Sequence, residues 1–291
     1  MCLIVFSYKD HATYPLIFAG NRDEFHARPA TPAHFWEKRP DLLAGRDLKA
    51  GGTWLGVTTG GRFATVTNYH ESVQSVSGNR HSRGDLVTEY LRKATPTESY
   101  LSDLEPRAGA FNGFNLIFGS AEALYYLSNR STADIYPGPA DIRMPGTRES
   151  EASSTGGGPS ALSSRAIEPG LHGLSNEQLD TPWPKVVRAK QLFRNVVDDD
   201  GEPDLDGLLD LLADSRPAPD DRLPRKRSNP ELERALSAIF IPGDVYGTRA
   251  STVVLFRSDG RVRFAERTFG PGGVESGTQM FEFDVEKAAQ K

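Results

Sequence analysis

The sequence has very little cysteine and no long apolar segment. Cys2 is the single cysteine among 291 residues, which excludes an intramolecular disulfide framework and a four-cysteine zinc site. The six histidines form no HExxH pair, so we expect no protein-built metal site and no cofactor. No stretch approaches the roughly 20 apolar residues that a membrane helix needs.

The sequence also lacks a basic excess and a secretory signal. The formal net charge is -5, which gives no support to a role in nucleic-acid binding. The opening MCLIVFSYKDH has no basic residue ahead of its apolar run and no small-residue cleavage site after it. We therefore expect a cytoplasmic protein without a transmembrane segment that acts on, or binds, a small molecule. The oligomeric state is left open.

Periodicity and turn residues predict one α+β domain over residues 1–291. The expected strands are 2–8, 15–20, 53–58, 62–68, 114–119, 123–128, 251–257, 262–269 and 278–285, and the expected helices are 84–94, one capped by Thr95 with Pro96 and Glu98, 183–197, 205–212 and 230–240. Residues 25–52 look loop-like, and the Ser- and Gly-rich residues 146–165 predict a mobile loop. Strands, helices and strands in this order indicate antiparallel sheets flanked by helices.

Cys2 is the first candidate for chemistry. Removal of Met1 leaves one residue with both a thiol and a free α-amine. The amine has a reference pKa of about 8 and can accept a proton near neutral pH. A thiol beside its own base is the minimal apparatus of an N-terminal nucleophile hydrolase. The alternative is that Cys2 is only a small buried residue.

A second group of candidates follows the expected strand 15–20, in the sequence Asn21-Arg22-Asp23-Glu24. An arginine near a thiol favours the thiolate, and an aspartate can orient an amine. A solvated charged turn is the alternative. Because neighbouring strand residues face opposite sides, Arg22 and Asp23 can share a site only if the strand ends or bulges there. Otherwise Asn21 or Glu24 takes the second role.

Three further polar residues lie near the ends of expected elements. Asn68 ends the strand 62–68, and Asn176 precedes the helix 183–197. Side-chain amides are suitable oxyanion donors, although asparagine is also a common turn residue. Arg249 lies at the start of the strand 251–257, where a lone arginine is ordinarily at the surface.

Several motifs from residue 2 to about residue 255 resemble those of a known family. They are Met-Cys-Leu-Ile at the start, Asn21-Arg22-Asp23-Glu24, Gly45 to Gly56 with its Gly-Gly-Thr-Trp-Leu-Gly block, Thr67-Asn68-Tyr69, Gly173 to Asn176 and Tyr246 to Thr252. Together they resemble the NRDE family, which is the family of the transport and Golgi organisation protein 2. The resemblance implies a four-layer αββα sandwich, similar in its core to the N-terminal nucleophile hydrolases.

The resemblance also implies a set of site residues. Choloylglycine and penicillin V acylases and acid ceramidase use an N-terminal Cys, an Arg and an Asp soon after it, two downstream Asn residues and a late Arg. In the same order this sequence offers Cys2, Arg22, Asp23, Asn68, Asn176 and Arg249 as catalytic residues. Substrate contacts are expected from other motif members: Asn21, Glu24, Trp54 and Tyr69. One departure is that the acylases separate their Arg and Asp by two residues, whereas here they are adjacent.

Two classes of function follow. The first is hydrolysis of a linear amide or a thioester of an acyl group, through an acyl-enzyme on Cys2. The second is a non-catalytic binding protein for acyl-CoA-like lipids or haem, because the family is associated with haem trafficking and lipid handling. His70 could then ligate haem iron. A structural partner in secretory traffic is suggested only by the family's name.

Overall fold

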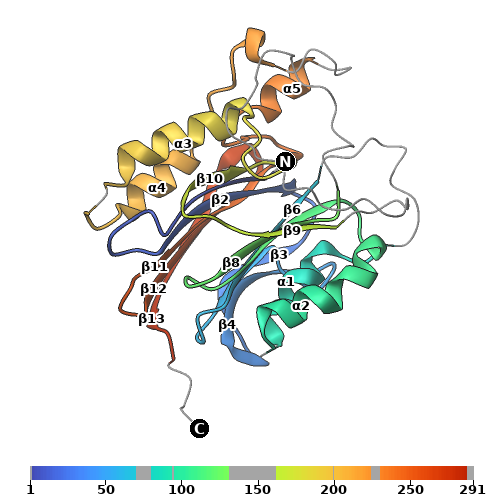
Figure 1. The fold of residues 1–291 in the computed structure, drawn as a ribbon. Helices are drawn as coiled ribbons and strands as arrows, with labels where there is room; N and C mark the ends of the chain where they lie inside the picture. The colour runs from blue at the N-terminus through green and yellow to red at the C-terminus, as the bar shows by residue number, and fades with distance from the viewer. Residues whose placement is uncertain are drawn as a thin grey trace, which may run out of the picture.

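The structure is a computed structural model that describes residues 2–69, 80–93, 95–130, 162–198, 200–223 and 230–286. Two antiparallel sheets face each other in it, with helices on their outer sides (Figure 1). The strand order is β10-β1-β2-β11-β12-β13 in the first sheet and β3-β4-β5-β6-β7-β8-β9 in the second. The predicted α+β, four-layer αββα sandwich is confirmed.

The elements have the following bounds. The first sheet contains β10 (Gly170–Leu174), β1 (Leu3–Tyr8), β2 (Leu16–Phe25), β11 (Tyr246–Phe256), β12 (Arg261–Phe269) and β13 (Glu275–Asp284). The second contains β3 (Ala30–Trp36), β4 (Arg39–Asp47), β5 (Leu55–Thr58), β6 (Phe63–Asn68), β7 (Phe114–Gly119), β8 (Leu124–Ser128) and β9 (Ser163–Ala166). The α-helices are α1 (Arg83–Arg92), α2 (Thr97–Leu104), α3 (Pro184–Val196), α4 (Leu205–Leu212) and α5 (Pro230–Leu236).

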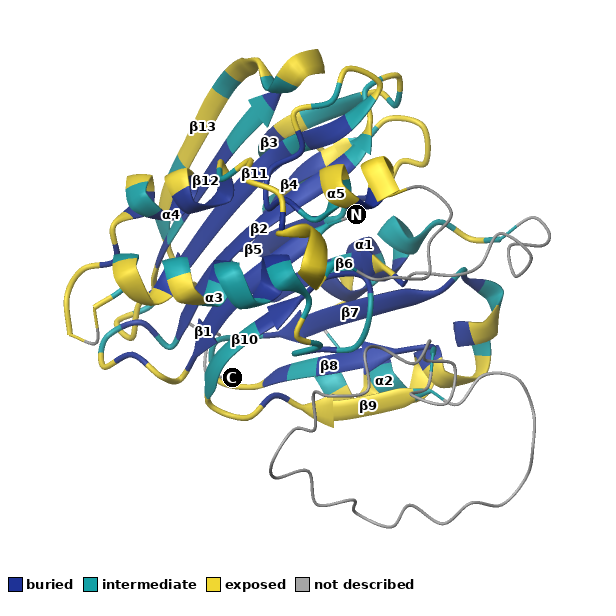
Figure 2. Ribbon diagram, turned by 90° about the horizontal axis from the view of Figure 1, so that it is seen from above, coloured by how far each residue is buried: buried dark blue, intermediate teal, exposed yellow. Residues whose placement is uncertain are grey.

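Three apolar clusters fill the spaces between the four layers. Ile4 and Phe6 of β1 face the second sheet, while Leu3 and Val5 pack under α3 and α4. A third cluster lies between the second sheet and the helices α1 and α2. Because β1 is buried on both faces, it reads as a continuous apolar run rather than an alternating one. Figure 2 shows this burial in the central strands and the exposed outer sides of the helices.

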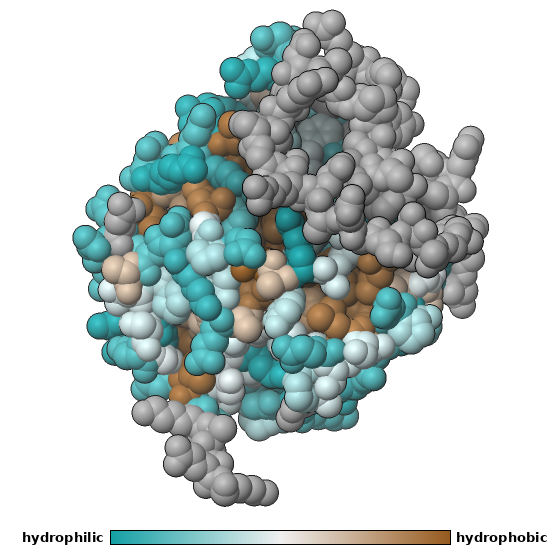
Figure 3. Space-filling model, in the orientation of Figure 1, coloured by the Kyte–Doolittle hydropathy of each residue, from teal (hydrophilic) through white to brown (hydrophobic). Residues whose placement is uncertain are grey.

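The surface carries its large apolar side chains in separate places. On the face drawn in Figure 3, hydrophilic residues predominate and apolar residues show in patches between them. Phe25 is 54% exposed and Met280 is 62% exposed, one near the end of β2 and the other on the edge strand β13. Within the described residues, no helix is long and apolar enough to cross a membrane.

The prediction of a loop over residues 25–52 is wrong, because β3 and β4 form a hairpin there. The prolines that suggested a loop occupy tolerant positions. Pro32 lies in β3, an edge strand of the second sheet, and Pro40 is the second residue of β4. On an edge strand or at the start of a strand, no neighbouring strand needs a hydrogen bond from that backbone nitrogen. A proline there therefore costs the sheet no hydrogen bond.

Other boundaries also differ from the prediction. The expected loop 146–165 is wrong at its end, because β9 begins at Ser163, and residues 146–161 lie outside the described part. The strand β10 was not predicted, and β2 continues five residues beyond the expected Gly20. The predicted capping box is wrong as well. Pro96 is the N-cap of α2, and no side chain makes a capping hydrogen bond there.

A buried carboxylate joins the two sheets near one end. Glu266 of β12 is 1% exposed, and its Oε1 accepts a hydrogen bond of 2.7 Å from the backbone nitrogen of Ala33 in β3. Its Oε2 accepts one of 3.2 Å from the hydroxyl of Thr252. Burial raises the pKa of Glu266 to about 7, although these hydrogen bonds and the charge of Arg22 act in the opposite direction.

This shift predicts a loss of stability as the pH rises from about 4.5 to about 7. The folded-state pKa of Glu266 lies above the ordinary value of 4.5, so its contribution is fully present below pH 4.5 and is lost as pH rises through about 7. The loss amounts to about 3 kcal/mol. In Glu266→Gln, this loss should disappear. Urea unfolding of both proteins at about pH 5 and about pH 8 measures it. An equal loss of unfolding free energy in both proteins would contradict the assignment.

Candidate active site

Cys2 lies directly before β1, at one end of the first sheet. The strand β1 pairs with β2 on one side and with β10 on the other. Continuing both antiparallel registers past the start of β1 brings Cys2 beside Arg22 and near Asn176. Its exposure is intermediate, so reagents can reach the only thiol of the chain.

A small cavity lies next to Cys2, between the two sheets. Its volume is about 20 Å³, which is room for about one water molecule. Gly20 lines it from β2, where a side chain would come within 3.0 Å of the Phe18 ring. Trp54 and Thr67 line it from the other sheet. The cavity can hold a water molecule or a carbonyl group, and anything larger extends outside it.

Arg22 approaches Cys2 from between the sheets. It is 8% exposed, and its guanidinium lies 4.4 Å from the ring centroid of Trp54. The missing side chain of Gly45 gives the Trp54 ring its room, because a Cβ there would overlap the ring. Burial lowers the pKa of Arg22, and Glu24 and Cys2 act to raise it. The guanidinium stays charged at physiological pH and acts electrostatically on the thiol.

Asp23 faces the opposite side of β2. The strand does not end at this point, and the bulge lies in its partner β11, between Thr248 and Ala250. Asp23 is 5% exposed, and its Oδ1 accepts a hydrogen bond of 2.8 Å from the Thr248 hydroxyl. Burial raises the pKa of Asp23, while Lys185 and Thr248 act to lower it. Arg22 and Asp23 therefore flank the end of the sheet from its two faces.

Lys185 was not predicted from the sequence. It lies in the first turn of α3 and is 3% exposed. Burial lowers the pKa of Lys185, and the charges of Asp23 and Cys2 act to raise it. The sequence does contain a signal: Lys185 precedes Ala189 by four residues, and this helical spacing puts it on the buried face of α3.

Asn176 connects the two sheets at this end. It is 4% exposed, has a φ of 58°, and donates from Nδ2 to the backbone oxygen of Asn68 at 2.7 Å. The side chain of Asn68 is exposed, and strand alternation sets it on the face of Ala64, whereas Thr67 lies on the cavity side. The structure thus brings the carbonyl of Asn68 to this end of the sheets.

A half-buried carboxylate holds the turn that carries Asn176. Asp180 accepts hydrogen bonds from the Gly173 nitrogen at 2.9 Å and pairs with His172 Nδ1 at 2.7 Å and with Lys190. Burial raises the pKa of Asp180, but the hydrogen bonds from His172 and Lys190 outweigh it and bring the pKa to about 2. This network ties the turn back to β10.

Arg249 binds backbone carbonyls of a turn and does not contact Cys2. It is the extra residue at the bulge of β11, and its Nη1 lies 3.0–3.3 Å from the backbone oxygens of Phe25, His26 and Arg28. The guanidinium therefore holds the turn between β2 and β3. Its charge acts on Arg22 rather than through a contact with Cys2.

The expected substrate-contacting residues have different surroundings. Asn21 lies on the helix side of β2, where its Nδ2 donates to the carbonyls of Leu212 and Ile239 at 2.8 and 2.9 Å. Glu24 lies 3.7 Å from Arg22, and the buried Tyr69 donates its backbone N–H to a carbonyl of the same sheet. Of the four, Asn21 and Trp54 line the cavity next to Cys2.

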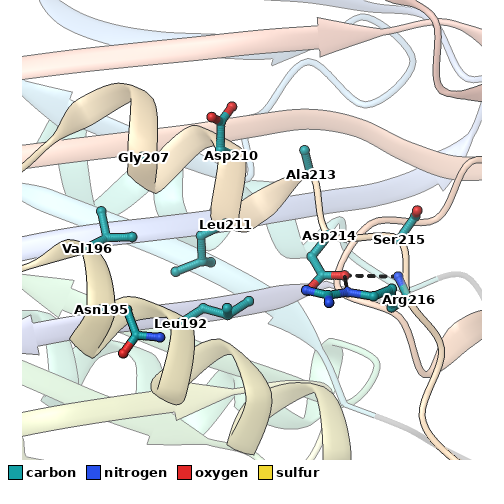
Figure 4. A pocket seen from close by; sticks show the side chains of 10 residues that line it. All are labelled: Leu192, Asn195, Val196, Gly207, Asp210, Leu211, Ala213, Asp214, Ser215 and Arg216. Atoms are coloured by element: carbon teal, nitrogen blue, oxygen red, sulfur yellow. Dashed lines mark hydrogen bonds and ion pairs between the residues drawn. The ribbon is translucent and has the colours of Figure 1, made fainter.

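Two other features lie apart from Cys2. In the described ranges, no three histidine, cysteine or acidic side chains are grouped to hold a metal ion, and His70 lies outside those ranges. A groove of about 520 Å³ between α3 and α4 is lined by Leu192, Leu211 and the Asp214–Arg216 pair, among others (Figure 4). It borders the C-terminal half of α3, about 10 Å or more along the helix from Lys185.

Comparison with known proteins identifies the family. A family model described as Transport and Golgi organisation 2 matches residues 1–271. The chain belongs to the Transport and Golgi organisation 2 family. The Transport and Golgi organization protein 2 homolog of Bos taurus is 35% identical over 92% of this chain and 93% of that protein. The homolog of Homo sapiens is 33% identical over the same shares.

Solved structures give a weaker likeness. A Caenorhabditis elegans N-acylethanolamine-hydrolyzing acid amidase ortholog superposes with a TM-score of 0.43 at 10% identity, covering 87% of this chain and 92% of that one. A mutant conjugated bile acid hydrolase from Clostridium perfringens gives 0.42 at 11% identity, covering 98% and 92%.

The Asp180 network predicts a stability change in this family member. Because the folded-state pKa of about 2 lies below the ordinary 3.8, Asp180 stabilises the fold above pH 3.8 and this contribution is lost as pH falls through about 2. Asp180→Asn should cost about 2 kcal/mol near neutral pH and progressively less in acid. Urea unfolding across that range measures the cost. The exposed Asp210→Asn is the control, and an equal, pH-independent cost in both variants would contradict the network.

Proposed function

We propose that this protein is an N-terminal cysteine hydrolase that cleaves a linear amide or a thioester through an acyl-enzyme on Cys2. One observation carries the proposal. The single thiol of the chain is partly exposed at the end of a sheet, beside the buried guanidinium of Arg22, and the buried Asp23 follows Arg22 on the opposite face of β2. An accessible thiol beside a fixed cation favours the thiolate, which is the nucleophilic form.

The first step needs a proton acceptor. After removal of Met1, the α-amine belongs to Cys2, and the register of β1 and β2 directs it toward Asp23. The carboxylate orients the amine, and the amine takes the thiol proton. Arg22 favours the thiolate, which attacks the carbonyl carbon of the substrate. The carbonyl electron pair moves to its oxygen, and a tetrahedral intermediate forms.

The developing oxyanion needs a hydrogen-bond donor. Asn176 has two N–H groups on Nδ2, and one of them is bonded to the carbonyl of Asn68. We assign the second N–H to the oxyanion and the Asn68 carbonyl to the orientation of that amide. The backbone N–H of Tyr69 is bonded to Gly113 and does not serve. In this assignment Arg249 acts through the turn that it holds, because its Nη1 is bound there.

The intermediate then collapses in two stages. The leaving amine or thiol departs with the proton from the α-ammonium, and the acyl group stays on Cys2 as a thioester. The α-amine next takes a proton from water, and the hydroxide attacks the thioester through a second oxyanion. Carboxylic acid leaves and the thiol is restored. The cavity next to Cys2 is too small for an acyl chain, which in this proposal extends outside it. A free cysteine suits the reducing cytoplasm, where we place the reaction.

Cys2→Ala should lower kcat by about a thousandfold or more, which is the size of the loss when other hydrolases lose their nucleophile. The measurement is intact mass after incubation with a series of acyl thioesters and the matching N-alkyl amides. The wild type should lack Met1 and gain one hydroxylamine-sensitive acyl group, while Cys2→Ala gains none. Full turnover in Cys2→Ala would overturn the proposal. Acyl species held equally by both proteins and never consumed would favour the binding-protein alternative, and activity with Met1 retained would exclude the α-amine as base.

Asn176→Gly tests the oxyanion donor. Glycine keeps the positive φ of 58° without strain, so the variant removes the amide and leaves the turn conformation accessible. Loss of one oxyanion donor should lower kcat by about a hundredfold to a thousandfold with little change in KM. Asn68→Ala is the matched comparison, because its carbonyl remains, and we expect a loss of about threefold or less. Equal losses in both variants would refute this division of roles.

A further inference from the structure

The fold and the proposed reaction leave Lys185 unexplained. Its side chain is 3% exposed, and within the described part of the chain its Nζ makes no hydrogen bond. It also lies in the first turn of α3, which has no acidic residue there. A buried ammonium costs free energy, and the positive end of the helix dipole adds to that cost. Packing and helix stability therefore do not account for a lysine at this position.

The surroundings of Lys185 point to Cys2. The charged groups that act on it, within the described residues, are Asp23 of β2 and Cys2 itself. The helix α3 also packs against β10 and α4, but His172 of β10 is paired with Asp180 instead. Burial lowers the pKa of Lys185, and the two anionic partners act against that shift.

Two cations from different layers thus act on Cys2. Arg22 lines the same cavity between the sheets as Cys2, and Lys185 lies in α3, the helix that packs against β1. Arg22 shares its charge with Glu24, at 3.7 Å, and with the Trp54 ring. The balancing group for Lys185 is Asp23, whose Oδ1 is also bonded to Thr248.

We propose that Lys185 is a positioning residue of the Cys2 site, whose buried ammonium group favours the thiolate of Cys2 from the helix side and is balanced by Asp23. The inference rests on the proposed function of Cys2 as a nucleophile. The thiol proton still goes to the α-amine of the processed chain, and Lys185 forms no bond and keeps its own proton. Its charge also disfavours protonation of that α-amine, which keeps the amine available as a base.

The single thiol makes the test specific. We would measure the alkylation rate of the full chain with iodoacetamide from about pH 6 to about pH 10, where the rate follows the thiolate fraction. Lys185→Met removes the charge and keeps an unbranched side chain. Its profile should move to higher pH by about one unit, which is about a tenfold slower reaction near neutral pH. The exposed Lys38→Met makes the same change in net charge and should leave the profile in place.

Two further variants keep the test decisive. Lys185→Gln is the second neutral variant if circular dichroism shows that Lys185→Met does not fold, and it should shift the profile in the same direction. Asp23→Asn removes the balancing carboxylate and should shift it to lower pH. A folded neutral variant with the wild-type profile overturns the proposal, as does an equal shift in Lys38→Met.

The alkylation assay needs no substrate, so the two proposals can fail separately. A shifted profile in a protein that never forms an acyl-enzyme supports the role of Lys185 and removes the hydrolase. An acyl-enzyme together with an unshifted profile supports the hydrolase and removes the role of Lys185.

Discussion

The interior position of β1 in the first sheet is the constraint on which the site depends. The strand is buried on both faces and hydrogen-bonded along both edges, to β10 and to β2. A slip by one residue would exchange the side chains that face the second sheet with those that face α3 and α4. Its register is therefore fixed, and Cys2 at its start has a fixed place without an anchor of its own.

Buried charge is concentrated at this same end of the sandwich. Arg22, Asp23, Lys185 and Glu266 are each 8% exposed or less, and they lie on β2, α3 and β12. Each would be costly alone, and each is tuned by another member of the group or by a hydrogen bond. Groups of mutually perturbed ionisable side chains occur more often at functional sites than elsewhere. The concentration supports a chemical role for the sheet end. The wide groove at the far end of α3 also holds an ionisable pair, Asp214 with Arg216; burial raises the pKa of Asp214, but hydrogen bonds from Arg216 and Arg188 outweigh it and bring the pKa to about 2.

The adjacent Arg22 and Asp23 show how the tertiary structure resolves a difficulty in the sequence. Alternation along a strand separates two neighbours to opposite faces, which counts against a shared site on a flat surface. Cys2 lies at the end of its strand, where both faces of the sheet can be reached. The bulge that the alternation seemed to require lies in β11 at Arg249, where it serves the turn between β2 and β3. The two residues of the motif therefore lie at the sheet end on opposite faces.

Local patterns in the sequence were sufficient to predict the family, the α+β class, the hairpins β5–β6 and β7–β8, and the helices α3 and α4. They also made Cys2 the first candidate for chemistry. These features depend on periodicities and motifs within a few residues. The hairpin β3–β4 escaped prediction because its prolines suggested a loop. The strands β9 and β10 escaped it because their partners, β8 and β1, are distant in sequence and local propensity does not reveal them. Only the folded chain decides that Asn68 contributes its carbonyl and that Lys185 lies with Cys2, 183 residues away in sequence. Side-chain direction and long-range proximity follow from strand order and layer packing, which no local pattern contains.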